Sequence, residues 1–190
     1  MNRRQAKGFL DSRKIKKLYR VAFPTCERKP FSIIKAMQKK GKCDLWIYEE
    51  NGVFLGFAST INSEKAILVD YLAVSENARG SGIGSAILQD LRAYYTDEKL
   101  FLEIETVDPL AENLKEREKR KAFYLKNGMM EMGVSVNIFD TDMELLSFGC
   151  RMTFEEYRAF YRENYSRFAA DRITPAKGTL PDPNRKRKKL

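Results

Sequence analysis

One segment constrains the fold more than any other: a nearly continuous apolar run leads directly into a glycine-rich turn and a helical pattern. Residues 66–74 read AILVDYLAV, and Asp70 is the one charged side chain among them. Such a run is typical of a strand buried on both faces of a sheet. ARGSGIGS follows at residues 78–85, and apolar residues at helical spacing continue to Tyr95. The segment therefore predicts a strand, a tight turn and a helix.

Helical and strand patterns alternate on both sides of this unit. Apolar spacing predicts helices over residues 11–23, 32–40, 112–127 and 153–168. Strands are expected over 101–107 and in two hairpins, one over 45–61 around Asn51-Gly52 and one over 129–148 around residues 140–142. The order predicts a single-domain mixed α/β (α+β) fold, with helices on both faces of one central mixed sheet. We expect this domain to span residues 1–174 and residues 175–190 to form a basic, weakly ordered tail.

Composition excludes whole classes of catalytic site. The 190 residues include no histidine, which excludes Ser-His-Asp and Cys-His nucleophile systems and HExxH zinc chemistry. The three cysteines are scattered and form no CxxC pair, which argues against a disulfide framework and a structural zinc site. We therefore expect no metal, and catalysis would depend on Glu, Asp, Tyr, Lys, a thiol, backbone amides or water.

The chain is basic, with a net charge of +9. No apolar run approaches the roughly 20 residues of a membrane helix, and no apolar segment follows Met1, so we expect a cytoplasmic protein without a membrane partner. Basic surfaces attract polyanions, which keeps a nucleic-acid-binding module with a basic tail as an alternative. The absence of a recognisable nucleic-acid-binding motif argues against that alternative. The sequence leaves a homodimer open.

The glycine-rich turn has the properties of a diphosphate-binding loop. Glycines at 80, 82 and 84 allow the backbone to approach a ligand closely, and the helix that follows directs its unpaired N–H groups and dipole at the turn. The spacing fits neither a Walker A loop nor the Rossmann GxGxxG fingerprint. A tight structural turn without a ligand is the alternative interpretation.

Residues 74–88, VSENARGSGIGSAIL, resemble the central motif of the GNAT acetyltransferases, [Q/R]-x-x-G-x-[G/A], in which Arg79, Gly82 and Gly84 take the fixed positions. The resemblance implies the GNAT fold, acetyl-CoA as acyl donor, and transfer of the acetyl group to a primary amine by direct attack in a ternary complex. It assigns the diphosphate of coenzyme A to the backbone of seven residues: Arg79, Gly80, Ser81, Gly82, Ile83, Gly84 and Ser85. It assigns the pantetheine arm to the backbone of Leu72, Ala73 and Val74, which would pair with it like an added strand. A GNAT fold that binds coenzyme A as a non-catalytic sensor is a further alternative.

A second part of the family pattern, Y-x-x-x-G-[FM], resembles AFYLKNGM at residues 122–129. The resemblance implies that Tyr124 is the general acid that protonates the sulfur of coenzyme A, and a phenol has a suitable pKa for that transfer. Many family members carry an asparagine about two turns earlier in this helix. Arg117 occupies that position here, and Asn113 lies one turn before it. The family places acceptor specificity in segments equivalent to residues 11–45 and 129–150, which carry no readable signature.

Two carboxylates share one face of the strand that reads FLEIETV, at Glu103 and Glu105. Carboxylates on an interior strand need a partner or a purpose. Neighbouring carboxylates raise one another's pKa, so either could accept the amine proton as a general base or bind a cationic acceptor. Salt bridges to basic residues of the next helix are the structural alternative. Asp70 is the competing candidate for the base.

Overall fold

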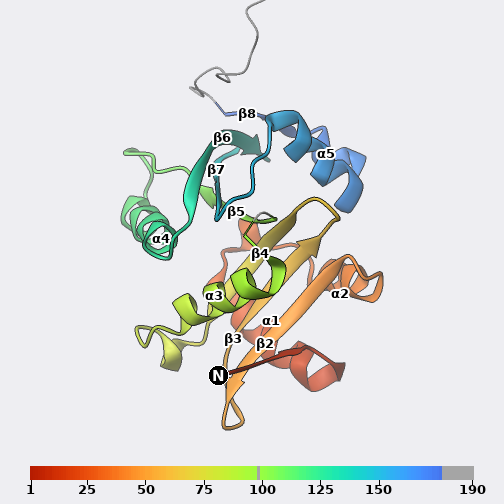
Figure 1. The fold of residues 1–190 in the computed structure, drawn as a ribbon, viewed down its shortest axis with the longest axis vertical. Coiled ribbons are helices and arrows are strands. Elements are labelled where there is room, and N and C mark those ends of the chain that lie inside the picture. The colour runs from red at the N-terminus through yellow and green to blue at the C-terminus, as the bar shows by residue number, and fades with distance from the viewer. Residues whose placement is uncertain (98, 177–190) are drawn as a thin grey trace, which may run out of the picture.

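A computed structural model describes residues 1–97 and 99–176 (Figure 1). Within these ranges the strands form one mixed sheet in the order β1-β2-β3-β4-β5-β7-β6-β8. The strands are β1 (Asn2–Gln5), β2 (Cys43–Glu50), β3 (Val53–Asn62), β4 (Ile67–Val74), β5 (Leu100–Glu105), β6 (Met130–Ile138), β7 (Thr141–Ser147) and β8 (Ile173–Pro175). The helices are α1 (Gly8–Ala22), α2 (Phe31–Lys39), α3 (Ile83–Tyr95), α4 (Leu114–Lys126), α5 (Phe154–Asn164) and α6 (Arg167–Ala170).

The helices cover both faces of the sheet, as the sequence predicted. On one face Ile15 of α1 and Tyr157 of α5 pack with Phe57 and Phe101 in the larger apolar cluster. On the other face the apolar stripe of α3 and Phe123 of α4 pack in a second cluster. Figure 1 shows α3 in front of the sheet and α1 behind it. α1, α3 and α5 are therefore held by the apolar stripes that their sequence spacing predicts, whereas α4 has no buried residue and packs through the partly buried Phe123 and Tyr124.

The first strand was not predicted, because its four residues are polar or charged. β1 forms the edge of the sheet and pairs antiparallel with β2. Its arginines satisfy acidic partners: Arg3 contacts Asp90 at 3.0 Å, and Arg4 forms a bridge of 2.6 Å to Asp11. Part of the N-terminal basic charge is thus used inside the fold. By contrast, the predicted hairpin at residues 51 and 52 is confirmed, with positive φ at both.

The predicted C-terminal helix, residues 153–168, is divided in two. Thr153 caps α5, and the Thr153 hydroxyl and the Glu156 carboxylate form a reciprocal capping box. The helix ends at Asn164 because Ser166 caps a new helix, accepting a hydrogen bond from the Ala169 N–H. The tail was predicted to begin at residue 175, but Pro175 is the last residue of β8, which pairs with β6 and contains the buried Ile173. Residues 177–190 lie outside the described residues.

Two irregularities in the centre of the sheet create space for a site. The parallel strands β4 and β5 pair only at Ile67 with Leu100 and Leu68 with Phe101, and then separate. Beyond this point the edge of β4 that faces β5 has no strand partner among the described residues. On its other edge, Val69 and Tyr71 pair with consecutive residues of β3, so Asp70 is the extra residue of a β-bulge. A bulge redirects the side chain that it contains.

Candidate functional site

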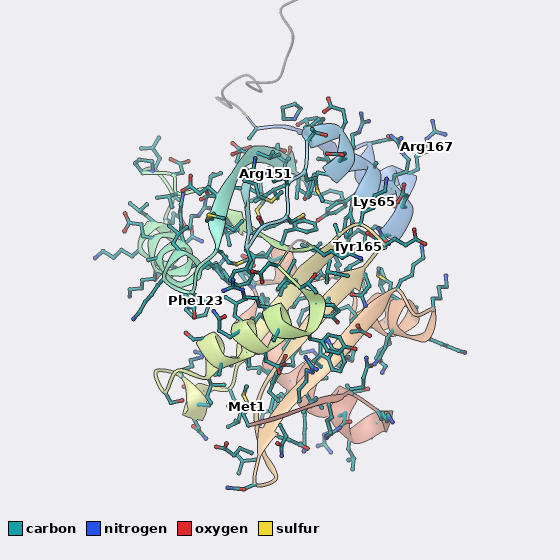
Figure 2. All side chains as sticks on the ribbon, in the orientation of Figure 1. Met1, Lys65, Phe123, Arg151, Tyr165 and Arg167 are labelled. Atoms are coloured by element: carbon teal, nitrogen blue, oxygen red, sulfur yellow. The ribbon has the colours of Figure 1, made fainter. Side chains whose placement is uncertain are left out.

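The separation of β4 and β5 opens a cavity of about 940 Å³. Its lining comes from the α1–α2 connection, β4, the glycine loop, β5, α4, the β6–β7 turn and Tyr161 of α5. The cavity therefore has contributions from helices on both faces of the sheet. Figure 2 labels one residue from each side: Phe123 lies between α4 and α3, and Tyr165 lies next to the sheet where α5 ends. A molecule in this cavity can contact both faces at once.

The glycine loop presents unpaired backbone donors at the start of α3. The first intrahelical hydrogen bond runs from the Ala86 N–H to the Gly82 carbonyl at 3.0 Å. The N–H groups of residues 80–85 have no acceptor in the part of the chain that the structure describes. Gly82 reaches this arrangement with a φ of +84°, a left-handed conformation that favours glycine. The loop and the helix N-terminus together form an anion-binding concavity.

Gly84 lies in the first turn of α3 with ordinary helical φ, and it lines the cavity. A Cβ there would lie 3.4 Å from the Phe123 ring and 3.6 Å from a Val74 methyl group, which are ordinary contact distances. The side chain of Arg79 is exposed, and its Nε donates to the Val74 carbonyl at 3.4 Å.

The free edge of β4 lies directly beside this loop. Leu72, Ala73 and Val74 pair with β3 on one edge, and their other edge faces the cavity. Extended backbone with an unpaired edge can bind an extended ligand through main-chain hydrogen bonds. The loop donors and the strand edge therefore form one continuous surface from the start of α3 into the cavity.

Tyr124 faces the cavity from α4. Its ring is half-buried and packs edge-to-face against Phe123, with the ring centroids 5.1 Å apart. Its hydroxyl has no hydrogen-bond partner among the described residues. Burial raises the pKa of Tyr124 above its ordinary value, and nearby Arg120 opposes that effect. The hydroxyl is therefore protonated at neutral pH and free to donate into the cavity.

Glu103 faces the cavity from β5. Its carboxylate accepts hydrogen bonds from the Tyr157 hydroxyl at 2.6 Å and the Tyr161 hydroxyl at 2.9 Å. Burial raises the pKa of Glu103, and the charge of Asp70 adds to this, while the two tyrosines and Lys29 oppose it. The raised pKa thus arises mainly from burial, with Asp70 as the contributing carboxylate in place of the expected neighbour Glu105.

Glu105 shares the face of Glu103, as predicted, but its oxygens are occupied. Arg117 contacts it at 2.7 Å, Arg120 at 3.3 Å, and the Asn113 amide donates to it at 3.2 Å. The salt bridges that were the structural alternative for these carboxylates therefore exist at Glu105. They also explain the charged start of α4, where Arg117 stands in the position of the family's asparagine.

Asp70 faces the cavity on the same side of the sheet as Glu103. Its Oδ1 accepts from Lys29 Nζ at 2.5 Å and from the Tyr165 hydroxyl at 2.9 Å. Its Oδ2 is buried and has no donor among the described residues. The Asp70 side chain is 7% exposed. An unsatisfied carboxylate oxygen in so buried a position is costly unless a ligand supplies the donor.

Three tyrosines and a lysine hold these carboxylates, and none of the four was predicted from the sequence as a site residue. Tyr157, Tyr161 and Tyr165 lie four residues apart along α5 and its end, so their hydroxyls reach Glu103 and Asp70 from one helix face. That spacing was visible in the sequence, but tyrosines at helical spacing usually indicate core packing. Lys29 could not have been found, because it lies in the irregular connection between α1 and α2.

Two absences apply to the described residues alone. In residues 1–97 and 99–176, no group of three or more acidic or thiol side chains is arranged to hold a metal ion. Over the same ranges, none of the helices has the length and apolar character that crossing a membrane requires.

The matches to known proteins are to acetyltransferases. A family model for the acetyltransferase (GNAT) domain matches residues 41–128. No match is found among curated protein sequences. Residues 41–128 include the free edge of β4, the glycine loop and Tyr124, but not α5.

Three solved structures illustrate the similarity of fold. A GNAT-family acetyltransferase from Bacteroides thetaiotaomicron has a TM-score of 0.71 and 16% identity, over 90% of this chain and 99% of that one. An aminoglycoside 6′-N-acetyltransferase complexed with coenzyme A has a TM-score of 0.61 and 14% identity, over 80% and 100%. A ribosomal-protein-alanine N-acetyltransferase from Brucella melitensis has a TM-score of 0.57 and 19% identity, over 77% and 98%. At such identities the similarity establishes the fold.

Proposed function

We propose that this chain, whose residues 41–128 match the acetyltransferase (GNAT) domain, transfers an acetyl group from acetyl-CoA to a primary amine. The observation that carries the proposal is the continuous surface formed by the N–H groups of residues 80–85 and the free edge of β4. A diphosphate satisfies the first part, and an extended pantetheine arm satisfies the second.

The acceptor would enter from the opposite side of the cavity. The donor surface begins at α3, whereas Glu103 and Asp70 face the α5 side. Two structurally similar proteins are named for amine acceptors, an aminoglycoside in one and a ribosomal-protein alanine in the other. These names support an amine as the acceptor class. A thioester that reaches the point where β4 and β5 separate would meet the amine there.

The chemistry requires proton transfer more than covalent catalysis. We assign the general base to Glu103, because it faces the cavity and burial raises its pKa toward the working range of a base. The amine nitrogen attacks the thioester carbonyl, and the proton that it loses passes to Glu103 directly or through water. Collapse of the tetrahedral intermediate breaks the carbon–sulfur bond, and the Tyr124 hydroxyl donates its proton to the leaving thiolate. Much of the rate acceleration would come from holding the two substrates together.

Binding and turnover test the proposal separately. Acetyl-CoA at about 100 times its dissociation constant should stabilise the folded protein by roughly 2.7 kcal/mol, which a thermal shift detects. Release of free coenzyme A thiol, followed across a panel of primary amines, then reports transfer. If no acyl-CoA shifts the unfolding temperature, the proposed function is wrong.

The Tyr124→Phe variant distinguishes a catalytic role of Tyr124 from a role in binding coenzyme A. We expect this variant to lower kcat by about 100-fold while the affinity for acetyl-CoA stays unchanged, because the hydroxyl acts on the leaving thiolate. Tyr94→Phe is the matched control, since Tyr94 is half exposed and packs against Trp46, away from the cavity. Binding without turnover in the unmodified protein, across the whole panel, would instead favour a sensor.

A further inference from the structure

The acceptor side of the cavity contains a ready-made binding site for a cation. Lys29 Nζ lies 2.5 Å from Asp70 Oδ1 and 2.8 Å from the Tyr165 hydroxyl. The same nitrogen lies 4.1 Å from the centre of the Tyr165 ring and 5.5 Å from that of Tyr71. A carboxylate, a hydroxyl and two aromatic faces around one ammonium form a strong cation site. Lys29 shows which chemistry this site selects.

The site is left incomplete by the protein itself. A carboxylate can accept about four hydrogen bonds, and Asp70 receives its donors only at Oδ1. Oδ2 is buried without a donor from the described residues. Because Asp70 is the extra residue of the bulge in β4, its position is fixed by the sheet and cannot relax easily toward solvent.

Lys29 is the cationic neighbour of both carboxylates on this side of the cavity. It contacts Asp70 directly, and its charge acts on Glu103. Glu103 receives only hydroxyl donors among the described residues, whereas Glu105 is bound by two arginines.

One group supplies the missing donor. We propose that the acceptor carries a second cationic group, an ammonium or guanidinium, in addition to the amine that is acetylated, and that Asp70 binds this group beside Lys29. The N–H groups of this cation satisfy Oδ2, and its positive charge strengthens the hydrogen bonds to the Asp70 carboxylate. The inference rests on the proposed function and narrows its acceptor to dicationic amines.

The test compares amines that differ only in the second charge. Putrescine is paired with butylamine, cadaverine with pentylamine, and agmatine with butylamine, so that several spacings are covered. We expect kcat/KM for the dication to exceed that for its monoamine by about tenfold or more at the best spacing, the value of a charge-assisted hydrogen bond. Equal kcat/KM values within every pair would overturn the inference.

Two variants act on this preference in opposite directions. Asp70→Asn should reduce the dication-to-monoamine ratio to that expected from the number of reactive amines. Lys29→Met should raise the ratio, because it removes the resident ammonium that competes for Asp70. Asp97→Asn is the matched control: Asp97 is an exposed carboxylate that pairs with Arg92, and its loss should leave the ratio unchanged.

Folding and function are separated within the same experiment. Each variant is first shown to bind acetyl-CoA, and if Asp70→Asn does not fold, Lys29→Met alone decides, with an unchanged or lower ratio counting against the inference. Monoamine turnover without any dication preference would remove the inference and leave the proposed function standing. No thiol release with any amine, together with no binding of acetyl-CoA, would remove the proposed function.

Discussion

Glu103 and Glu105 lie two residues apart on one face of β5, yet their surroundings give the two carboxylates different tasks. Glu105 is enclosed by Arg117, Arg120 and Asn113, so its lone pairs are occupied by the charged start of α4. Glu103 accepts only from neutral hydroxyls, and burial raises its pKa. The oxygens of Glu105 are occupied by arginine donors, whereas Glu103 is held by phenols and faces the cavity, where it can accept a proton from a substrate.

Neutral substitutions should therefore affect the two positions differently. Glu105→Gln is expected to lower the free energy of unfolding by about 2 kcal/mol, because it leaves the largely buried Arg117 without its partner, and to change kcat only a few-fold. Glu103→Gln should lower kcat by about 100-fold and change stability little. Urea unfolding and thiol release measure the two effects. A large loss of activity in Glu105→Gln with normal stability would reverse the assignment of the base.

The tyrosine that holds Glu103 should set the pH dependence of the reaction. The Tyr161 hydroxyl stabilises the charged form of Glu103, so its removal raises the pKa of that carboxyl further. The base must be deprotonated to act. The acidic limb of the kcat/KM profile should consequently move to higher pH in Tyr161→Phe, by about one unit for a hydrogen bond worth roughly 1.5 kcal/mol.

The acceptor's own ionisation is separated from this effect by a second acceptor of different basicity. If the acidic limb arises from the amine, its pH changes with the acceptor and is the same in the unmodified protein and in Tyr161→Phe. If it arises from Glu103, its pH changes with the variant. Tyr94→Phe provides the control for loss of a tyrosine hydroxyl. An acidic limb that stays in place in Tyr161→Phe would contradict the assignment of Glu103.

At the scale of elements, the junction of β4, the glycine loop and α3 forms the site that we propose for the acyl donor. Gly82 adopts a φ of +84°, which costs a residue with a Cβ about 1–2 kcal/mol. Gly82→Ala should therefore distort the turn and weaken binding of acetyl-CoA by about tenfold or more, as measured by calorimetric titration. The donors of residues 80–85 depend on this geometry.

Gly41 offers a control with the same strain at a different place. It has a φ of +70° at the end of α2, in open space and away from the cavity. Gly41→Ala should lower the free energy of unfolding by a similar amount without changing the affinity for acetyl-CoA. If both variants weaken acetyl-CoA binding equally, the effect is general destabilisation and the loop has no special role.

Some elements of the fold could be predicted from their sequences and others could not. β4, the glycine loop and α3 were predicted because apolar period and glycine position agree there, and the Asn51-Gly52 turn was predicted because its positive φ values require such residues. β1 was missed because an edge strand needs no apolar residues. The side of the cavity that we propose for the acceptor was predicted least well. The bulge at Asp70 and the contact between Lys29 and Asp70 depend on tertiary structure, which no local sequence pattern encodes.

At the scale of the whole molecule, the two faces of the sheet carry the two proposed substrate sites, and one cavity connects them. α3 and α4 pack on one face, next to the loop donors and Tyr124, and α1, α2 and α5 pack on the other, next to Glu103 and Asp70 (Figure 1). The separation of β4 and β5 joins the two sides in one cavity. The family match covers residues 41–128, so Lys29 and the tyrosines of α5 lie outside the matched domain, on the side of the cavity that we propose for the acceptor.

A crystal structure of the protein with acetyl-CoA tests this arrangement most directly. We predict that the diphosphate oxygens lie within hydrogen-bond distance of the N–H groups of residues 80–85, that the pantetheine arm follows the free edge of β4, and that the thioester points between Tyr124 and Glu103. A complex in which the ligand binds elsewhere, with the cavity between β4 and β5 filled by side chains, would contradict the account.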